Sequence, residues 1–227
     1  NMAIVTGRGK RAIEDHFDNS FELESQLQGT SKEHYLHEIK DVIDKATFTY
    51  IRQQKMLGLG HAILTGEPLI GKEAFAVILA DDLCTLFQEG VISQMIKIYD
   101  KYKCSIVAIQ EVHPSHISKY GVIDGDLIDN SEDIYRVTDM VEKPSEENAP
   151  SNMAIIGRYI LTPDIFNILK KIKPDKGKEI QITDALLQQA KQGKVIAYKF
   201  KGERFDCGSV EGYVQATNYF AKLTNII

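Results

Sequence analysis

The sequence has few cysteines, no long hydrophobic run and no excess of positive charge. Its three cysteines, Cys84, Cys104 and Cys207, are odd in number, far apart and never in Cys-x-x-Cys spacing. This pattern argues against a disulfide framework and against a structural zinc site. No stretch approaches the ~20 apolar residues of a membrane span, and the start of the sequence shows no signal-peptide pattern. We therefore expect a soluble, cytoplasmic protein with no membrane partner.

Basic residues are in the minority, with 27 Lys and Arg against 32 Asp and Glu, and the formal net charge is −5. A nucleic-acid surface needs a clustered basic face, so we expect no nucleic-acid partner. A nucleotide is still possible, because a metal ion and a few local lysines can hold its phosphates. The length of 227 residues suits one large α/β domain or two small ones. We expect a single domain over 1–227, because no linker divides the chain.

The most informative stretch is an unbroken apolar run at 75–80 that ends in Asp81 and Asp82. Such a run predicts a strand buried on both faces, as in a parallel sheet covered by helices. A ligand would then sit at the carboxyl end of the strand. At least one of the two carboxylates should face a cleft, because an unpaired buried carboxylate is too costly, and Mg²⁺ would neutralise it. The alternative is that both aspartates only cap the next turn.

Strand and helix patterns alternate along the chain, which predicts a doubly wound α/β sheet. Strands are expected within 2–7 and at 48–51, 75–80, 105–110, 135–142, 153–161 and 195–200, with a further hairpin arm at 119–124. Helices are expected at 10–17, after 30–33, at 62–65, over 91–102, and from 162, 179 and 209, with a loop at 174–178.

Residues 30–33 have the spacing of a capping box, and Thr183 and Ser209 are expected to cap the helices near them. The helix after Ser209 is expected to bury one face, made of Tyr213, Val214, Thr217 and Phe220. Gly58 and Gly60 would let the backbone approach a ligand closely, with plain turn chemistry as the alternative. His61 beside them is expected to be a packed or capping side chain.

The expected strand 135–142 leads into Glu142, Lys143 and Pro144, and the proline cannot continue a strand ladder. Successive side chains of a strand point to opposite faces. We therefore expect Glu142 and Lys143 to find separate partners rather than to form a mutual salt bridge.

Seven short motifs follow one another along the chain. They are Gly-Leu-Gly-His-Ala (58–62), Leu-Ala-Asp-Asp (79–82), Tyr-Gly-Val (120–122), Val-Glu-Lys-Pro (141–144), Ser-Asn-Met-Ala-Ile-Ile-Gly-Arg-Tyr (151–159), Glu-Ile-Gln-Ile-Thr-Asp (179–184) and Phe-Asp-Cys-Gly (205–208). In this order they resemble the bacterial UTP-glucose-1-phosphate uridylyltransferase family. The resemblance implies a Rossmann-like nucleotidyltransferase fold with a mixed, mostly parallel central sheet flanked by helices. It also implies the Mg²⁺-dependent reaction of UTP with glucose 1-phosphate to give UDP-glucose and pyrophosphate, and a homo-oligomer, either a dimer or a tetramer.

The resemblance assigns catalytic roles to three residues. Asp81 and Asp206 would hold the metal ion, and Lys143 would bind phosphate. Asp82 would support the metal site without contacting the metal ion itself, or would cap a turn. This set fits the chemistry, because the reaction needs two anions brought into line with their repulsion neutralised. No general base is required, since the sugar phosphate is already an anionic nucleophile.

The resemblance also assigns substrate contacts. Gln53 and Gly58 would contact the edge of the uracil. Glu142 would accept hydroxyl groups of the glucose ring, in a pocket completed by the backbones of Gly121 and Ile155.

The sequence departs from the family at its start. Members begin with a strand and a Gly-rich loop containing Gly-Thr-Arg, followed by a Lys-Glu pair, and none of this is present here. We expect that a segment preceding Asn1 is missing. If the 227 residues were the entire protein, the alternative would be a non-catalytic module that binds a sugar nucleotide. Among enzymes, the alternative is a thymidylyltransferase making dTDP-glucose, which shares the Glu-Lys-Pro motif.

Overall fold

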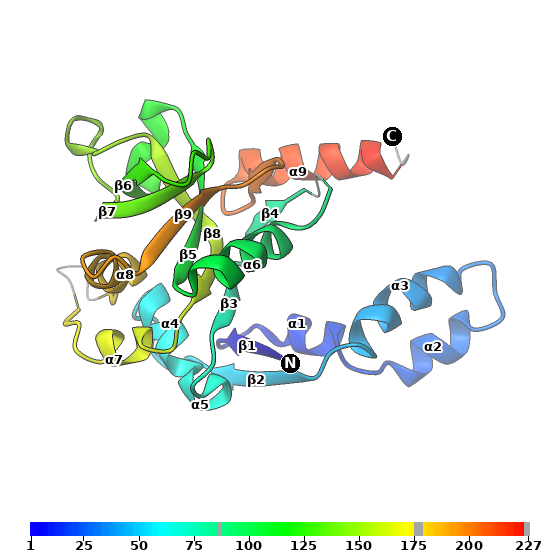
Figure 1. Ribbon diagram of the computed structural model, residues 1–227. Coiled ribbons are helices and arrows are strands. Elements are labelled where there is room, and N and C mark those ends of the chain that lie inside the picture. Colours follow the sequence, from blue (N-terminus) through cyan, green and yellow to red (C-terminus); the bar gives the residue numbers. More distant parts are fainter. Residues whose placement is uncertain (86–87, 175–178, 225–227) are drawn as a thin grey trace. The chain divides into compact units, whose positions relative to one another are not determined.

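The computed structural model describes residues 1–85, 88–174 and 179–224, without the side chains of residues 38 and 39 (Figure 1). The chain divides into two compact units. Unit 1 comprises Asn1–Gly71 with Pro174–Glu179, and unit 2 comprises Lys72–Lys173 with Ile180–Ile227. The expectation of a single domain over 1–227 stays a prediction. Most of the loop expected at 174–178 lies outside the described residues.

The described residues of unit 1 form a two-stranded parallel sheet and five short helices. The strands are β1 (Met2–Thr6) and β2 (Phe48–Arg52), and the helices are α1 (Arg11–His16), α2 (Phe21–Leu27), α3 (His34–Ile43), α4 (Leu59–Thr65) and α5 (Glu67–Ile70). The predicted strands and helices of this region are confirmed, and α2 and α5 are additions to them. The capping box is wrong. Glu33 occupies the N-cap position of α3 without a side-chain cap bond, and its carboxylate accepts from the backbone N–H of Gly29 (3.1 Å).

Unit 2 is built on a six-stranded sheet with strand order β3-β8-β5-β9-β7-β6 and a separate two-stranded pair, β4 and β10. The strands are β3 (Phe75–Ile78), β4 (Asp82–Cys84), β5 (Ser105–Glu111), β6 (Gly121–Leu127), β7 (Ile134–Glu142), β8 (Met153–Leu161), β9 (Val195–Lys199) and β10 (Arg204–Asp206). The mixed sheet is confirmed, but the mostly parallel arrangement is wrong for this sheet. Only β5 and β9 pair in parallel among its described strands, because β7 returns from β6 as a hairpin and β8 runs against β3, β5 and β6.

Strand β3 differs from the expectation of burial on both faces. It pairs with β8 alone among the described strands, and its side chains alternate between half-buried and exposed. The side chain of Ile78 is 57% exposed. The strand also stops at Ile78, so the predicted apolar run divides into β3, a turn, and β4, which begins at Asp82.

The helices of unit 2 are α6 (Val91–Tyr102), α7 (Ile165–Leu169), α8 (Ile182–Ala190) and α9 (Val210–Leu223), with short 3₁₀ turns η1 (Pro114–Lys119) and η2 (Glu146–Asn148). The spacing of Val91, Met95, Ile98, Tyr99 and Tyr102 predicts one face of helix α6. Val91, Met95 and Ile98 are buried, and the two tyrosines are half-buried. The three buried side chains belong to a core cluster with Ile106 and Ile196 of the sheet. Each such side chain contributes about 1.5–3 kcal/mol when fully buried. No helix among the described residues has the length and apolar character needed to cross a membrane.

Helix α9 confirms its predicted cap but not its predicted buried face. The backbone N–H of Gly212 donates to the Ser209 hydroxyl (3.1 Å), as expected for an N-cap. The side chains of Tyr213 and Val214 are 62% and 50% exposed, and Gly212 and Ala216 are buried instead. A Cβ atom at Gly212 would lie 2.0 Å from the carbonyl oxygen of Asp206. The helix therefore approaches the chain after β10 through its smallest residues.

Candidate active site

Asp81 and Asp82 lie next to each other in unit 2 but have different surroundings. Asp82 is 6% exposed; its Oδ2 accepts from the backbone N–H of Gly157 (2.8 Å), and its Oδ1 pairs with Nε of Arg204. Asp81 is exposed, and no hydrogen bond or ion pair to its carboxylate is found among the described residues. Asp82 is thus fully engaged by protein groups, and Asp81 is the carboxylate available to a ligand.

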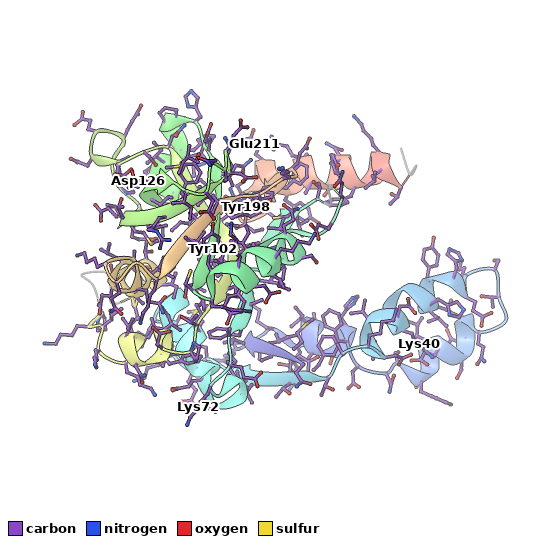
Figure 2. The ribbon with its side chains drawn as sticks, in the orientation of Figure 1. Lys40, Lys72, Tyr102, Asp126, Tyr198 and Glu211 are labelled. Atoms are coloured by element: carbon purple, nitrogen blue, oxygen red, sulfur yellow. The ribbon has the colours of Figure 1, made fainter. Side chains whose placement is uncertain are left out.

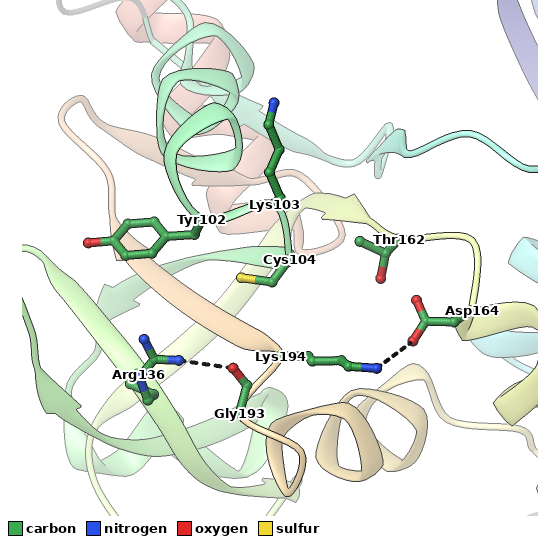
Figure 3. A pocket seen from close by; sticks show the side chains of 8 residues that line it. All are labelled: Tyr102, Lys103, Cys104, Arg136, Thr162, Asp164, Gly193 and Lys194. Atoms are coloured by element: carbon green, nitrogen blue, oxygen red, sulfur yellow. Dashed lines mark hydrogen bonds and ion pairs between the residues drawn. The ribbon is translucent and has the colours of Figure 1, made fainter.

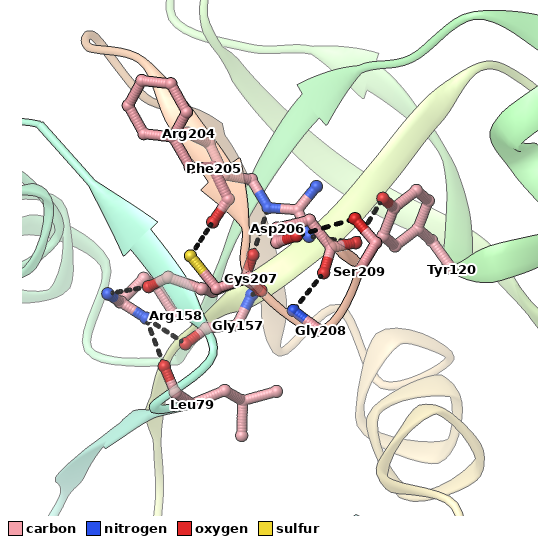
Figure 4. A network of polar contacts seen from close by, with 11 residues as sticks. Leu79, Tyr120, Gly157, Arg158, Arg204, Phe205, Asp206, Cys207, Gly208 and Ser209 are labelled. Carbon is pink, nitrogen blue, oxygen red and sulfur yellow. Dashed lines mark hydrogen bonds and ion pairs between the residues drawn. The ribbon is translucent and has the colours of Figure 1, made fainter. Parts of the chain in front are cut away.

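The turn between β3 and β4 is held by the middle of β8. A Cβ atom at Gly157 would lie 2.6 Å from Oδ2 of Asp82, so only glycine leaves room for that carboxylate. The next residue, Arg158, is 9% exposed and donates to the carbonyl oxygens of Leu79 (3.1 Å) and Asp82 (2.5 Å) (Figure 4). These bonds satisfy the buried guanidinium and fix the backbone on either side of Asp81.

Asp206 ends β10, directly opposite Asp82 of β4 in the antiparallel register. Its Oδ2 accepts from the Tyr120 hydroxyl (2.7 Å) and lies 3.5 Å from Nη2 of Arg204, while its Oδ1 accepts from the backbone N–H of Gly208 (3.1 Å) (Figure 4). Burial raises the pKa of the Tyr120 phenol, so the hydroxyl keeps its proton and donates. Burial disfavours the charged Arg204 guanidinium, but the bonds and charge interactions with Asp82 and Tyr120 together outweigh burial, so the pKa of Arg204 is raised.

The structure brings the two predicted metal ligands together. The backbone N–H of Cys207 donates to the carbonyl oxygen of Asp81 (2.8 Å), which joins the two loops. A Cβ atom at Gly208 would lie 3.1 Å from Oδ1 of Asp206 and 3.4 Å from Oδ2 of Asp81. The two oxygens therefore flank one point, next to a residue without a side chain.

This pair of carboxylates fits a magnesium ion. Mg²⁺ is usually held by one or two carboxylates together with waters and substrate phosphates, rather than by a full protein cage. A larger group of His, Cys, Asp and Glu that could hold a metal ion is not found in the part of the chain that the structure describes.

The residues predicted to hold the sugar also lie together. Gly121 of β6 pairs with Glu142 of β7. A Cβ atom at Gly121 would lie 3.1 Å from Oε2 of Glu142, 3.2 Å from Cγ2 of Thr183 and 3.3 Å from Cδ1 of Ile155. The predicted cap role of Thr183 is wrong, because α8 begins at Ile182 with Gln181 as its N-cap. The Thr183 hydroxyl donates to Oε2 of Glu142 instead.

Lys143 departs from the expected strand geometry. Its φ is 46°, in the left-handed region, so the alternation of the strand ends at Glu142. The ammonium group consequently lies 3.8 Å from Oε1 of Glu142, and the prediction of separate partners is wrong. The Lys143 side chain is 55% exposed and can still meet an incoming anion.

Gln53 and Gly58, the predicted uracil contacts, belong to unit 1. The Nε2 atom of Gln53 donates to the carbonyl oxygen of Gly58 (3.3 Å) and lies 2.9 Å from Nδ1 of His61. Gly58 has a φ of 86°, which favours glycine at this position. His61 is thus half-buried and contacts Gln53, and helix α4 has no side-chain cap bond, so the cap alternative for His61 is not found among the described residues. Within the described residues, no hydrogen bond to the carbonyl oxygen of the Gln53 amide is found, so this oxygen can accept from a ligand.

A cavity of about 310 Å³ lies elsewhere in unit 2 (Figure 3). It is lined by Tyr102, Lys103, Cys104, Arg136, Thr162, Asp164, Gly193 and Lys194. Its cations are engaged by the protein: Arg136 donates to the carbonyl oxygen of Gly193 (2.9 Å), Lys194 lies 4.0 Å from Asp164, and Lys103 pairs with Asp100 at 2.7 Å. Because none of the predicted residues lines it, we assign the site to the carboxylates and not to this cavity.

Sequence reasoning missed three polar residues of the site, namely Tyr120, Thr183 and Arg204. Tyr120 and Thr183 fall inside the quoted motifs, and Arg204 directly precedes one of them. Their position in those motifs was the available signal. Their partners lie 86, 41 and 122 residues away in the chain, so no local pattern reveals them.

Comparison with known proteins places this arrangement in a class. The sequence matches the family model described as nucleotidyl transferase over residues 12–222. It is 64% identical over 219 residues to a UTP–glucose-1-phosphate uridylyltransferase of Pseudomonas aeruginosa, covering 96% of this chain and 78% of the relative.

Two solved structures of UDP-glucose pyrophosphorylase agree with the sequence match. The apo form has a TM-score of 0.94 at 60% identity, covering 98% of this chain and 81% of that one. The form complexed with UDP-glucose has a TM-score of 0.89 at 58% identity, covering 97% and 80%. The fold and the site thus define an enzyme of the nucleotidyl transferase class. Within that class, the chain belongs to the UTP–glucose-1-phosphate uridylyltransferase family, which confirms the resemblance and the predicted nucleotidyltransferase fold.

Proposed function

We propose that this chain catalyses the Mg²⁺-dependent reaction of UTP with glucose 1-phosphate, giving UDP-glucose and pyrophosphate. The observation that carries the proposal is the convergence of the Asp81 and Asp206 carboxylates in unit 2. The 64% identity to a UTP–glucose-1-phosphate uridylyltransferase supports UTP as the nucleotide, in preference to the thymidine alternative.

In unit 2, the acidic side chains and the basic side chain have different roles. Asp81 and Asp206 would hold the magnesium ion, which when bound supplies the positive charge that lets two phosphates approach. The exposed ammonium group of Lys143 binds a phosphate oxygen. Because the attacking phosphate is already anionic, orientation and charge neutralisation are sufficient and no side chain has to remove a proton.

The sugar and the base are recognised by neutral contacts and one carboxylate. Glu142, with one oxygen bound by the Thr183 hydroxyl, accepts hydroxyl groups of the glucose ring. The backbones of Gly121 and Ile155 close this pocket. In unit 1, Gln53 offers its amide to the uracil edge.

Two wider expectations are also proposals. A homo-oligomer, either a dimer or a tetramer, is supported by exposed apolar side chains along α9. These are Val210 (84%), Tyr213 (62%), Val214 (50%) and Leu223 (65%). A cytoplasmic location is supported by the cysteines, which are all free.

The test is Asp81→Asn. The exposed Asp81 carboxylate has no partner in the described residues, so we expect the free energy of unfolding to change by about 0.5 kcal/mol or less. We expect kcat, measured by pyrophosphate release from UTP and glucose 1-phosphate, to fall by about 10²- to 10³-fold, the loss typical of removing an electrostatic stabiliser.

The control is Asp126→Asn, which neutralises another exposed carboxylate on β6 (Figure 2). This variant should keep the parent kcat. Near-normal turnover by Asp81→Asn would remove Asp81 from the site. Faster turnover with dTTP than with UTP would contradict the choice of nucleotide.

A further inference from the structure

Arg204 is a buried cation next to the proposed metal site. Its side chain is 6% exposed, its Nε pairs with Oδ1 of Asp82, and its Nη2 lies 3.5 Å from Oδ2 of Asp206. The guanidinium carbon lies 4.8 Å from the centre of the Tyr120 ring, a cation–π distance. A carboxylate on one side and an aromatic face on another leave the guanidinium one orientation, with its second nitrogen directed at Asp206.

The two carboxylate oxygens of Asp206 have different partners. Oδ2 accepts from the Tyr120 hydroxyl and faces Arg204. Oδ1 accepts from the backbone N–H of Gly208 and is the oxygen that faces the same point as Oδ2 of Asp81. The groups that bind Oδ2 therefore determine where Oδ1 is directed.

We infer that Tyr120 and Arg204 are positioning residues that hold the Asp206 carboxylate in the orientation needed for a divalent cation. The inference rests on the proposed function, because it takes Asp81 and Asp206 as the metal ligands. Partners of metal ligands typically change metal affinity by about 10- to 100-fold when they are removed.

The charge of Arg204 does not oppose this role. A lone guanidinium near the site would repel a divalent cation. Here Asp82 lies in direct contact with it and cancels most of its field. Orientation of Asp206 is then the main effect of Arg204 on the metal.

Two substitutions separate orientation from charge. Tyr120→Phe removes only the hydroxyl and keeps the ring against Arg204. Arg204→Lys keeps the positive charge, but a single ammonium group cannot serve Asp82 and Asp206 with the fixed fork of a guanidinium. We expect each variant to bind Mn²⁺, a probe for the magnesium site, about 10-fold more weakly. Binding is measured from the electron paramagnetic resonance signal of free Mn²⁺, without substrates. The double variant should lose less than the product of the two effects, because both act on one carboxylate.

Matched controls make the same chemical changes elsewhere in unit 2. Tyr198→Phe removes a phenol hydroxyl that donates to Gln94 (2.9 Å) (Figure 2), and Arg136→Lys removes the guanidinium that donates to Gly193. Both should bind Mn²⁺ as the parent protein does. Thermal unfolding of each variant verifies that it is folded, and Tyr120→Phe alone decides the question if Arg204→Lys does not fold.

Asp206→Asn separates the inference from the proposal beneath it. If Asp206→Asn loses Mn²⁺ affinity while Tyr120→Phe and Arg204→Lys bind normally, the positioning role is overturned and the metal site stands. If Asp206→Asn itself binds Mn²⁺ normally, the metal assignment of the proposed function fails, and the inference fails with it.

Discussion

The two halves of the proposed site in unit 2 are held in opposite ways. The carboxylate cluster consists of Asp81, Asp82, Tyr120, Arg204 and Asp206, and the sugar pocket consists of Gly121, Glu142, Ile155 and Thr183. The carboxylate cluster is held by a buried ion pair, since the side chains of Arg204 and Asp82 are only 6% and 9% exposed. The sugar pocket is held by close packing of side chains around Gly121, which has no side chain of its own. We therefore expect that removing one charged group destabilises the carboxylate cluster, whereas adding one methyl group disrupts the sugar pocket.

The largest expected effect is in the carboxylate cluster. Asp82→Asn removes the nearer counter-charge of the buried Arg204 guanidinium and leaves only Asp206, whose Oδ2 lies 3.5 Å from Nη2. Breaking a buried pair in this way costs about 3–5 kcal/mol. Urea denaturation measures the loss of unfolding free energy. The neighbouring substitution Asp81→Asn is the matched control, because it makes the same change on an exposed side chain. A loss below about 1 kcal/mol for Asp82→Asn would show that charge burial does not hold the cluster.

A smaller effect is expected when the sugar pocket gains one methyl group. In Gly121→Ala the new Cβ lies 3.1–3.3 Å from three side chains, so those side chains must shift, at a cost of about 1–3 kcal/mol. The KM for glucose 1-phosphate should rise more than the KM for UTP, because one of the three side chains is Glu142. Gly7→Ala is the control, since a Cβ there meets no atom within 4 Å. Equal changes in both KM values would argue against a sugar pocket at this place.

The smallest effect is expected from Thr183→Val, which keeps the shape of the pocket and removes the hydroxyl that donates to Glu142. The Glu142 side chain is 25% exposed, so water can replace the lost donor. We expect a cost of about 1 kcal/mol, or a rise of roughly fivefold in the KM for glucose 1-phosphate. Thr217→Val removes an exposed hydroxyl from α9 and should change neither KM. A parent-like KM for Thr183→Val would mean that Thr183 does not position Glu142.

Much of the fold was predictable because its patterns are local. The mainly apolar stretch 153–161 gives the bounds of β8, and the apolar spacing of α6 gives most of its buried face. The buried face of α9 was not predictable from spacing, because the helix is placed by the close approach of Gly212 to Asp206. Apolar spacing identifies large side chains, and here the contact is made by small ones.

The candidate site was predictable as a set of motifs but not as a set of roles. Asp81 and Asp82 have the same side chain and adjacent positions, and only the distant Arg204 and Gly157 make one of them structural. Thr183 has the residue type of a helix cap, yet its hydroxyl belongs to Glu142. In both cases the residue that determines the role is distant in the sequence and is placed by the pairing of strands. Local sequence does not reveal that pairing.

The left-handed backbone at Lys143 sets a conflict between two demands on one residue. Most residues with a Cβ lose about 1–2 kcal/mol in that conformation, whereas glycine accepts it freely and asparagine accepts it at a lower cost. Neither of these carries an ammonium group. A substitution that removes the backbone strain at position 143 therefore also removes the positive charge beside Glu142. Higher stability and stronger phosphate binding thus favour different residues at this position.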